Sequence, residues 1–336
     1  MPLETLRSPV TPAGLHYVLT HYDIPQVDRR DWRLSVGGHV RTPTELSLSD
    51  IESMPGVTLP VTLECAGNGR AFLAPRPVSQ PWLMEAVGTA EWSGPPLSTV
   101  LEQVGVAPGA EEVVFRGLDR GVEAGVVQSF ERSLPIDQAT QPEVILAYAM
   151  NGRPLPPQHG FPLRLVVPGW YGMASVKWLE RITVLDEPFS GHQQFHAYRM
   201  RQQEDEPGVP LSRMEPRSLM VPPGIPEFPS RTRYLRPSHV VLEGKAWSGW
   251  ARIVRVDVSI DGGRSWDKAV VGEPMGLYTW APWTYEWDAA AGEYELASRA
   301  TDETGRTQPL QSTWNLGGYG NNEIQRVRVI VSEGRS

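Results

Sequence analysis

The chain has 336 residues, 40% of them hydrophobic and 21% charged, and its formal net charge of −8 argues against nucleic acid or an anionic membrane as main partner. This length exceeds the size at which one hydrophobic core usually keeps growing, so we expect two domains. The single cysteine excludes an intramolecular disulfide and cysteine-rich zinc or iron–sulfur sites, so metal chemistry would need one protein sulfur plus ligands that the chain does not encode.

The apolar runs of the chain are short. Even the longest, such as Leu165 to Val167, cannot cross a bilayer, and the first residues lack the apolar core of a signal peptide. We therefore expect a soluble cytoplasmic protein without a membrane span, or a periplasmic protein if a leader has been removed.

The segment 34–101 alternates short apolar runs with glycine and proline breaks. Within it, only residues 48–54 and 97–104 have a pattern that favours short helices. The 32 glycines and 32 prolines of the whole chain follow no period, which is typical of short strands joined by turns. We expect a first domain of α+β or mainly β structure.

The most informative part of this domain is the sequence TLPVTLEC, which ends at Cys65. Alternation predicts a strand with Val61, Leu63 and Cys65 on one face, followed by a turn with two glycines that would let backbone approach a bulky ligand. Arg70 should favour ionisation of the thiol, and a thiolate suits soft-metal ligation. Taken alone, an isolated cysteine is more often a small buried hydrophobe.

Residues 202–237 form a polar, proline-bearing stretch with little periodicity. Such a stretch is typical of a linker that runs over a surface. We place the domain boundary near residue 205, which gives domains 1–204 and 205–336.

The second domain shows the alternation of half-buried strands. In residues 253–260 the apolar side chains face one way and Arg255, Asp257 and Ser259 face the other. Gly262 and Gly263 should supply positive φ for a tight hairpin turn, and the runs around residues 294–300 and 327–331 predict two further strands. These signals suggest an all-β immunoglobulin-like sandwich.

The sequence VTLECAGNGR resembles the molybdenum-site signature of the sulfite oxidase family. Similar motifs follow in the family's order along nearly the whole chain: AEWSGPPLSTVL, LAYAMNGRPLPPQHGFPLRLVVPGWYG, SVKWL, KAWSG, RVDVSIDGG and TWNL. The resemblance implies a molybdopterin-binding domain of mixed α+β fold followed by an immunoglobulin-like dimerisation domain. It also makes Cys65 the single protein ligand of molybdenum, whose other sulfurs come from the pterin.

The resemblance assigns further residues to the site. Arg70 matches an arginine of the family's anion pocket, Trp82 a tryptophan near the metal, and Tyr198 the active-site tyrosine, although Trp82 could equally pack in a core. The positions that match the family's cofactor-binding residues are His21, Cys65, Asp119, His159, Arg164, Ser175, Val176 and Lys177. Without the resemblance, we would expect Lys177 and Arg164 each to be a solvated charge on the surface.

Two family arginines are missing from the chain. Leu19 stands two residues before His21, and Gly317 follows the sequence TWNL. Each missing guanidinium removes charge-assisted hydrogen bonds of roughly 1.5 to 3 kcal/mol. We expect weak sulfite binding, with Arg70 alone anchoring a smaller charge or with a neutral substrate in the pocket.

The function implied by the resemblance is oxygen-atom transfer to sulfite or a related small substrate, with electrons passed to an external carrier. Two alternatives stay open: an oxygen-removing reductase for sulfoxides or N-oxides, and a cofactor-binding relic without turnover. The resemblance also implies a homodimer. The aromatic sequence YTWAPWTYEW, residues 278–287, could anchor the dimer interface or fill the core of the sandwich.

Overall fold

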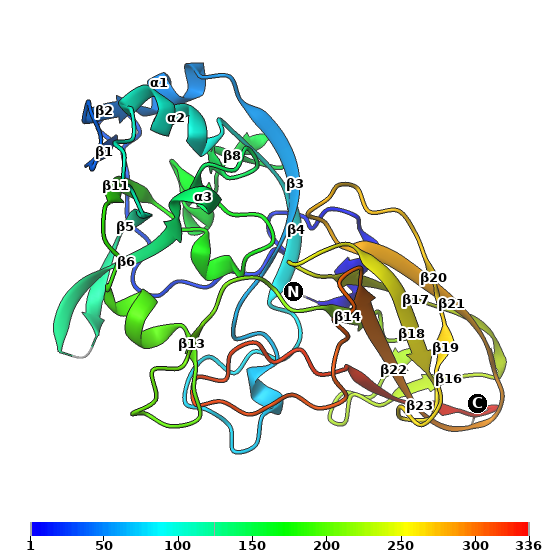
Figure 1. Ribbon diagram of the computed structural model, residues 1–336. Coiled ribbons are helices and arrows are strands. Elements are labelled where there is room, and N and C mark those ends of the chain that lie inside the picture. Colours follow the sequence, from blue (N-terminus) through cyan, green and yellow to red (C-terminus); the bar gives the residue numbers. More distant parts are fainter. Residues whose placement is uncertain (1, 124, 335–336) are drawn as a thin grey trace.

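The computed structural model describes residues 2–123 and 125–334. Its strands fall into two groups, one at the upper left of Figure 1 and one at the lower right, with the long strands β3 and β4 between them. The two groups correspond to an α+β domain and a β-sandwich, which confirms the predicted fold class.

The first group has a five-stranded and a four-stranded sheet. The larger sheet has the order β2-β1-β11-β5-β6, and its strands are β1 (Arg33–Gly38), β2 (Thr44–Ser47), β5 (Glu112–Glu123), β6 (Val126–Pro135) and β11 (Leu179–Leu185). In it β1 and β11 are parallel and the other neighbours antiparallel. The smaller sheet has the order β3-β4-β8-β9, with β3 (Val57–Glu64), β4 (Val87–Gly94), β8 (Ala149–Met150) and β9 (Arg153–Pro154). Two further pairs join β7 (Ile145–Ala147) to β10 (Arg164–Val166) and β12 (Arg199–Met200) to β13 (Val209–Pro210).

Both predicted helices are present. Helix α1 (Leu48–Ser53) begins at a capping box between Ser47 and Asp50, and α2 (Leu97–Val104) buries four apolar side chains one and two turns apart. The remaining helical turns are α3 (Ile136–Ala139), η1 (Leu3–Arg7), η2 (Arg70–Phe72), η3 (Pro157–His159), η4 (Gly172–Ala174) and the π-helical η5 (Gln193–Ala197). Among the described residues, no helix has the length and apolar character needed to cross a membrane.

The second group consists of two sheets packed face to face. One sheet has the order β14-β17-β21-β20, with β14 (Arg217–Met220), β17 (Ser238–Trp247), β20 (Val270–Val271) and β21 (Ala281–Ala289). The other has the order β15-β16-β23-β22-β18-β19, with β15 (Ile225–Pro226), β16 (Arg233–Leu235), β18 (Ile253–Ser259), β19 (Asp267–Lys268), β22 (Gly292–Asp302) and β23 (Arg326–Val331). Buried side chains such as Trp283, Val258 and Leu296 form the core between them. The immunoglobulin type of this sandwich stays a prediction.

Two expectations about this region were wrong. Residues 202–237 are not only a surface linker, because they contain β13 to β16, and all four residues of β14 are buried. Strand β18 does not alternate along its whole length, since Asp257 and Ser259 are also buried. Arg255 and Arg299 form ion pairs with Asp257, and these pairs allow a carboxylate on a buried face.

The connection after β18 is longer than a tight hairpin turn. Gly262 and Gly263 do have positive φ, as predicted, but residues 260–266 separate β18 from β19. The carboxylate of Asp261 accepts hydrogen bonds from the backbone N–H groups of Arg264 and Ser265 and thereby closes the loop.

The tryptophans of residues 278–287 lie in the interior. Trp283 and Trp287 belong to the core of the sandwich, and Trp280 packs in the core of the first domain. All three are buried within one chain, which agrees with core packing and corrects their suggested role as interface anchors.

Candidate functional site

Cys65 follows directly after β3 and is buried. The strand has the predicted apolar face with Val61 and Leu63, but toward its end the other face is buried too. On that face Thr62 bonds to Thr89 and accepts a hydrogen bond from the backbone N–H of Trp280, while Glu64 pairs with Arg217. The end of β3 is therefore held between the two domains.

The turn after Cys65 is tight. Asn68 N–H donates to the Cys65 carbonyl and Arg70 N–H to the Gly67 carbonyl, and Gly69 has a φ of 86°. A Cβ at Gly67 would lie 2.6 Å from Cζ of Arg70. The first glycine thus makes room for the guanidinium of Arg70, where we had expected room for a ligand.

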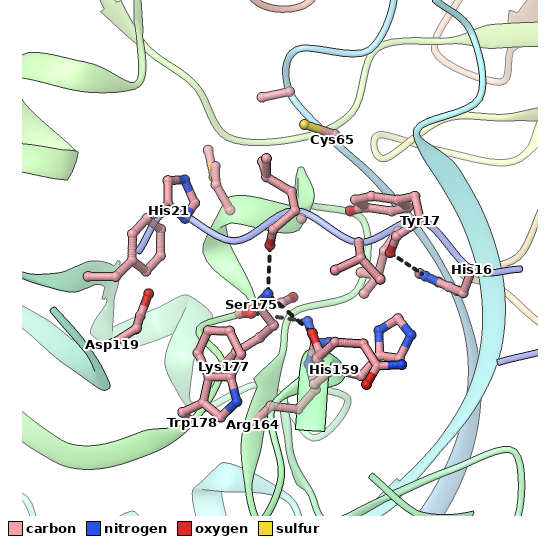
Figure 2. Close-up of a pocket in the computed structure, with 18 of the residues that line it drawn as sticks. His16, Tyr17, His21, Cys65, Asp119, His159, Arg164, Ser175, Lys177 and Trp178 are labelled. Carbon is pink, nitrogen blue, oxygen red and sulfur yellow. Dashed lines mark hydrogen bonds between the residues drawn. The ribbon is translucent and has the colours of Figure 1, made fainter. Parts of the chain in front are cut away.

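A pocket opens beside Cys65. Most of the predicted site residues line it: His21, Cys65, Asp119, His159, Arg164, Ser175, Lys177 and Tyr198. Figure 2 shows Cys65 at the upper edge of the pocket and Lys177, Arg164 and His159 gathered on the lower side. One end of the pocket therefore offers a sulfur and the other a cluster of cationic and polar groups.

The cations of this cluster are not neutralised by hydrogen-bonded carboxylates in the described part of the chain. Lys177 Nζ donates to the backbone carbonyls of Leu19 at 2.6 Å and Gln158 at 3.4 Å. Arg164 donates to the carbonyls of His159 and Ser175 at 3.0 and 3.1 Å. Burial and the nearby Arg164 lower the pKa of Lys177 to about 7. Such buried cations, whose hydrogen bonds go to carbonyls, are suited to holding an anion.

Polar groups of the pocket can form hydrogen bonds with a heterocyclic ligand. Burial raises the pKa of Asp119 to about 7, and burial together with Arg164 lowers that of His159 to about 4. The buried Nε2 of His16 has no hydrogen-bond partner among the described residues. A buried orphan atom in a pocket indicates a missing partner, and pterin nitrogens and oxygens would supply one.

Tyr198 reaches the pocket from the segment between η5 and β12. Its hydroxyl and His21 Nε2 form a short hydrogen bond, and the His21 ring stacks on Phe130 with centroids 4.1 Å apart. Burial lowers the pKa of His21 to about 4 and raises the pKa of Tyr198. The imidazole is therefore neutral, and His21 contacts the predicted catalytic tyrosine directly. The tautomer with its proton on Nε2 donates to the phenol oxygen and leaves the phenol proton free to point into the pocket.

Three predicted site residues do not line the pocket. Arg70 is buried, with Nε donating to the Gly317 carbonyl at 2.9 Å and Nη1 to the Gln80 carbonyl at 3.0 Å. Trp82 is half-buried beside Tyr17, which does line the pocket. Val176 is buried, and its carbonyl accepts from Leu165 N–H. Their roles stay predictions.

The expected net shift of the thiol pKa was wrong in sign, although the charge of Arg70 acts in the expected direction. Burial raises the pKa of Cys65 to about 11, and the N–H of Gly67 and the charge of Arg70 oppose this increase without reversing it. A sequence shows the neighbouring arginine but not the depth of burial. A divalent or higher cation at the sulfur would favour the thiolate directly.

The residues present fit a molybdopterin. A lone sulfur suits the metal, and the cations and orphan polar groups suit the phosphate and the heterocycle of the pterin. Sequence reasoning missed His16 and Tyr17, which also line this pocket. The only available signal was their position a few residues before His21 in the same segment.

Family models match both domains. Residues 21–193 match the oxidoreductase molybdopterin binding domain, and residues 227–332 match the Mo-co oxidoreductase dimerisation domain. By structure, the chain is similar to the sulfane dehydrogenase SoxCD from Paracoccus pantotrophus. The TM-score is 0.82 at 29% identity, with 96% of this chain and 83% of that chain covered.

Curated relatives agree with the family models. Human mitochondrial sulfite oxidase is 35% identical over 96% of this chain, which spans 62% of that protein. The NADH nitrate reductase of Ulva prolifera is 34% identical over 95% of this chain, which spans 40% of that protein. Chicken sulfite oxidase is 35% identical over 92% of this chain, which spans 70% of that protein. The chain thus belongs to the sulfite oxidase family of molybdopterin-dependent oxidoreductases.

Proposed function

We propose that the chain is a molybdenum-dependent oxidoreductase that adds an oxygen atom to a small sulfur compound. The observation that carries the proposal is the pocket, with the thiol of Cys65 at one end and the cations Lys177 and Arg164 at the other. A metal held by one protein sulfur and by an anionic organic chelate fits both ends. Family membership supports the same cofactor and activity.

Each predicted site residue has a proposed part. Cys65 binds the metal, and the buried cations Lys177 and Arg164 hold the phosphate of the pterin. The remaining proposed contacts to the pterin are those of His21, Asp119, His159, Ser175 and the backbone at Val176. Trp82 and Tyr17 exclude water near the sulfur, while Arg70 keeps the turn after Cys65 in place through its carbonyl contacts.

The bound cofactor supplies two-electron oxygen-atom transfer. In the net reaction the sulfur compound gains an oxygen atom from water, and two protons and two electrons are released. The electrons pass to an external carrier. The given sequence has no Cys-X-X-Cys-His motif for covalent attachment of a haem. Tyr198 lies at the pocket with a protonated phenol directed by His21, so it can hydrogen-bond an oxygen of the substrate or product.

We also propose a homodimer that uses the second domain, since residues 227–332 match a dimerisation domain. We further propose that the first domain comprises residues 1–204 and the second residues 205–336. We also propose that the protein is located in the cytoplasm.

The reverse direction is a second candidate. The relative from Ulva prolifera is a nitrate reductase, so a scaffold similar to this chain occurs in a reductase. A dye-linked assay separates the two directions, because an oxidised dye accepts electrons from sulfur compounds and a reduced dye donates them to nitrate, sulfoxides or N-oxides.

Elemental and pterin analysis of the purified protein comes first. We expect stoichiometric molybdenum and pterin, followed by reduction of an oxidised dye that depends on a sulfur compound. Protein without both components would contradict the proposal and would favour a relic. Loaded protein that reacts only with a reduced dye and an oxygen donor would establish the reverse direction.

A further inference from the structure

Tyr198 directly follows the π-helical turn η5, which has only five residues. Its N–H donates to the Gln193 carbonyl at 3.3 Å, a bond that spans five positions of the chain. Turns of this type are rare, and a single helical turn does not form stably by itself. The place of the Tyr198 ring in the pocket therefore depends on side chains that hold η5 from outside.

Arg132 of strand β6 contacts this segment at two points. Its Nη1 donates to the Gln193 carbonyl at 2.6 Å, so that carbonyl accepts from Arg132 and from the Tyr198 N–H together. Cζ of Arg132 lies 5.5 Å from the centroid of the Tyr198 ring, which is within the range of a cation–π contact. Tyr319 of the second domain packs against the same ring, with centroids 5.1 Å apart. The guanidinium thus contacts both the backbone turn and the ring of the tyrosine.

The hydrogen-bond partner of Tyr198 is supported by the same strand. His21 Nε2 and the Tyr198 hydroxyl form a hydrogen bond, and the His21 ring stacks on Phe130 with centroids 4.1 Å apart. Phe130 and Arg132 are two positions apart in β6, and both are buried. Side chains two positions apart in a strand lie on one face of the sheet. One face of β6 therefore supports both His21 and Tyr198.

Stability does not account for the arginine at position 132. In the described part of the chain its side chain donates to the Gln193 carbonyl alone, and its buried Nε has no partner. A buried cation of this kind costs free energy, and a well-packed apolar side chain is often as stable or more so. Unlike Lys177 and Arg164, Arg132 does not line the pocket, so it does not meet a ligand there. Its contact with a pocket residue is the one with Tyr198.

We propose that Arg132 is a positioning residue that keeps the Tyr198 hydroxyl in its hydrogen bond with His21 and thereby at the pocket. The inference rests on the proposed function, because it concerns the tyrosine that bonds an oxygen of the substrate or product. Arg132 itself touches neither substrate nor cofactor. Its loss releases the Gln193 carbonyl and one face of the ring, and a displacement of about 1 Å at a reacting group can lower the rate roughly a hundredfold.

The test uses loaded enzyme and one dye-linked assay with sulfite and with dimethyl sulfide, an anionic and a neutral sulfur compound. Arg132→Met and Arg132→Lys are each made in the parent and in the Tyr198→Phe variant. Arg116→Met, at an arginine of β5 that pairs with Glu131 and Glu180, is the matched control. Crystal structures of the loaded parent and of loaded Arg132→Met show whether the tyrosine moves. Molybdenum and pterin content is measured for each protein, so that loss of cofactor is not mistaken for loss of positioning.

We expect Arg132→Met to break the hydrogen bond between His21 and Tyr198 and to lower kcat roughly ten- to a hundredfold, with KM nearly unchanged. Arg132→Lys, which keeps a cation that can donate to the carbonyl, should recover part of the loss. In the Tyr198→Phe background Arg132→Met should change kcat by less than about twofold, because no hydroxyl remains to be positioned. Arg116→Met should keep kcat of the parent within about twofold. A merely structural role would lower kcat by the same factor in both backgrounds.

The inference is overturned if Tyr198 keeps its bond to His21 in the crystal of Arg132→Met, if kcat of that variant is unchanged, or if the loss is equal in both backgrounds. The proposed function would stand in these cases. Loaded parent enzyme that oxidises neither compound would overturn the proposed function itself and this inference with it. If Arg132→Met does not fold, Arg132→Lys decides, because its smaller loss of kcat should also vanish in the Tyr198→Phe background.

Discussion

Arg217 Nη1 lies 2.8 Å from Oε1 of Glu64, and both side chains are buried. Glu64 directly precedes Cys65, and Arg217 begins β14 of the second domain. Asn68 Nδ2 and Trp247 Nε1 also donate to the carboxylate, at 3.0 and 2.9 Å. The residue next to the Cys65 thiol is thus held by groups from the turn and from the second domain.

Removal of one partner of this pair should destabilise the protein strongly. Arg217→Leu would leave a buried carboxylate without its charge partner, which typically costs about 3 to 5 kcal/mol of the free energy of unfolding. The double variant Glu64→Gln/Arg217→Leu should lose less, because no unpaired buried charge remains and the amide oxygen can still accept from Trp247. Urea denaturation measures both, and equal losses would show that the charge of Glu64 does not matter.

Replacement of Cys65 should abolish metal binding and leave the fold. Cys65→Ala removes the only thiol of the chain, so we expect molybdenum at background level and no turnover. The pterin should be retained in part, because the cations that hold it are unchanged. Met173→Leu, which removes the other kind of sulfur from the same pocket, is the control and should keep its molybdenum. Equal metal content in the two variants would refute ligation by Cys65.

Lys177→Met should weaken binding of the cofactor without lowering the stability of the cofactor-free protein. The lysine donates to two carbonyls, so its charge is available to an anion, and its loss should weaken cofactor retention by roughly ten- to a hundredfold. The cofactor-free variant should be no less stable than the cofactor-free parent, because a buried charge has been removed. Pterin release and thermal unfolding measure the two effects, with exposed Lys268→Met as the control. A loss of stability with unchanged retention would contradict the assigned role.

Local patterns predicted those features that depend on near neighbours along the chain. Helices α1 and α2, strand β22 and the position of Cys65 after a strand follow from apolar spacing and turn residues. The segment 202–237 shows the limit of such patterns. The side chains of strand β14 do not alternate between polar and apolar. All four are buried in the sheet where β14 pairs with β17, a contact that the local pattern does not indicate.

Long-range contacts explain the other differences. Glu64 and Arg217 are 153 positions apart, and no period in the sequence connects them. The same is true of Tyr319 and Tyr198, which come from different domains. The pKa of Cys65 depended on burial by such distant segments, so the adjacent Arg70 suggested the wrong sign.

Asp119 should make the cofactor-free protein less stable as pH rises from about 4 to about 7. Burial raises its pKa to about 7 in the folded state, so in this window the folded chain holds a proton that the unfolded chain has lost. Asp119→Asn cannot titrate and should lose this slope. Denaturation at pH 5 and pH 7 tests the sign: the free energy of unfolding of the parent relative to the variant should fall toward pH 7. Exposed Asp137→Asn should show no such trend, and a rise would contradict the assignment.

Tyr198→Phe should lower kcat and leave KM nearly unchanged. Burial raises the pKa of Tyr198, so the phenol keeps its proton at working pH and acts as a hydrogen-bond donor, not as a base. A donor that assists the reacting oxygen mainly in the transition state affects kcat, and we expect a decrease of roughly a hundredfold. Tyr22→Phe removes a phenol that donates to Glu123 and not into the pocket, and it should keep kcat within about twofold. Steady-state kinetics of both loaded variants decide the point, because equal kcat values would mean that the Tyr198 hydroxyl has only a structural contact with His21.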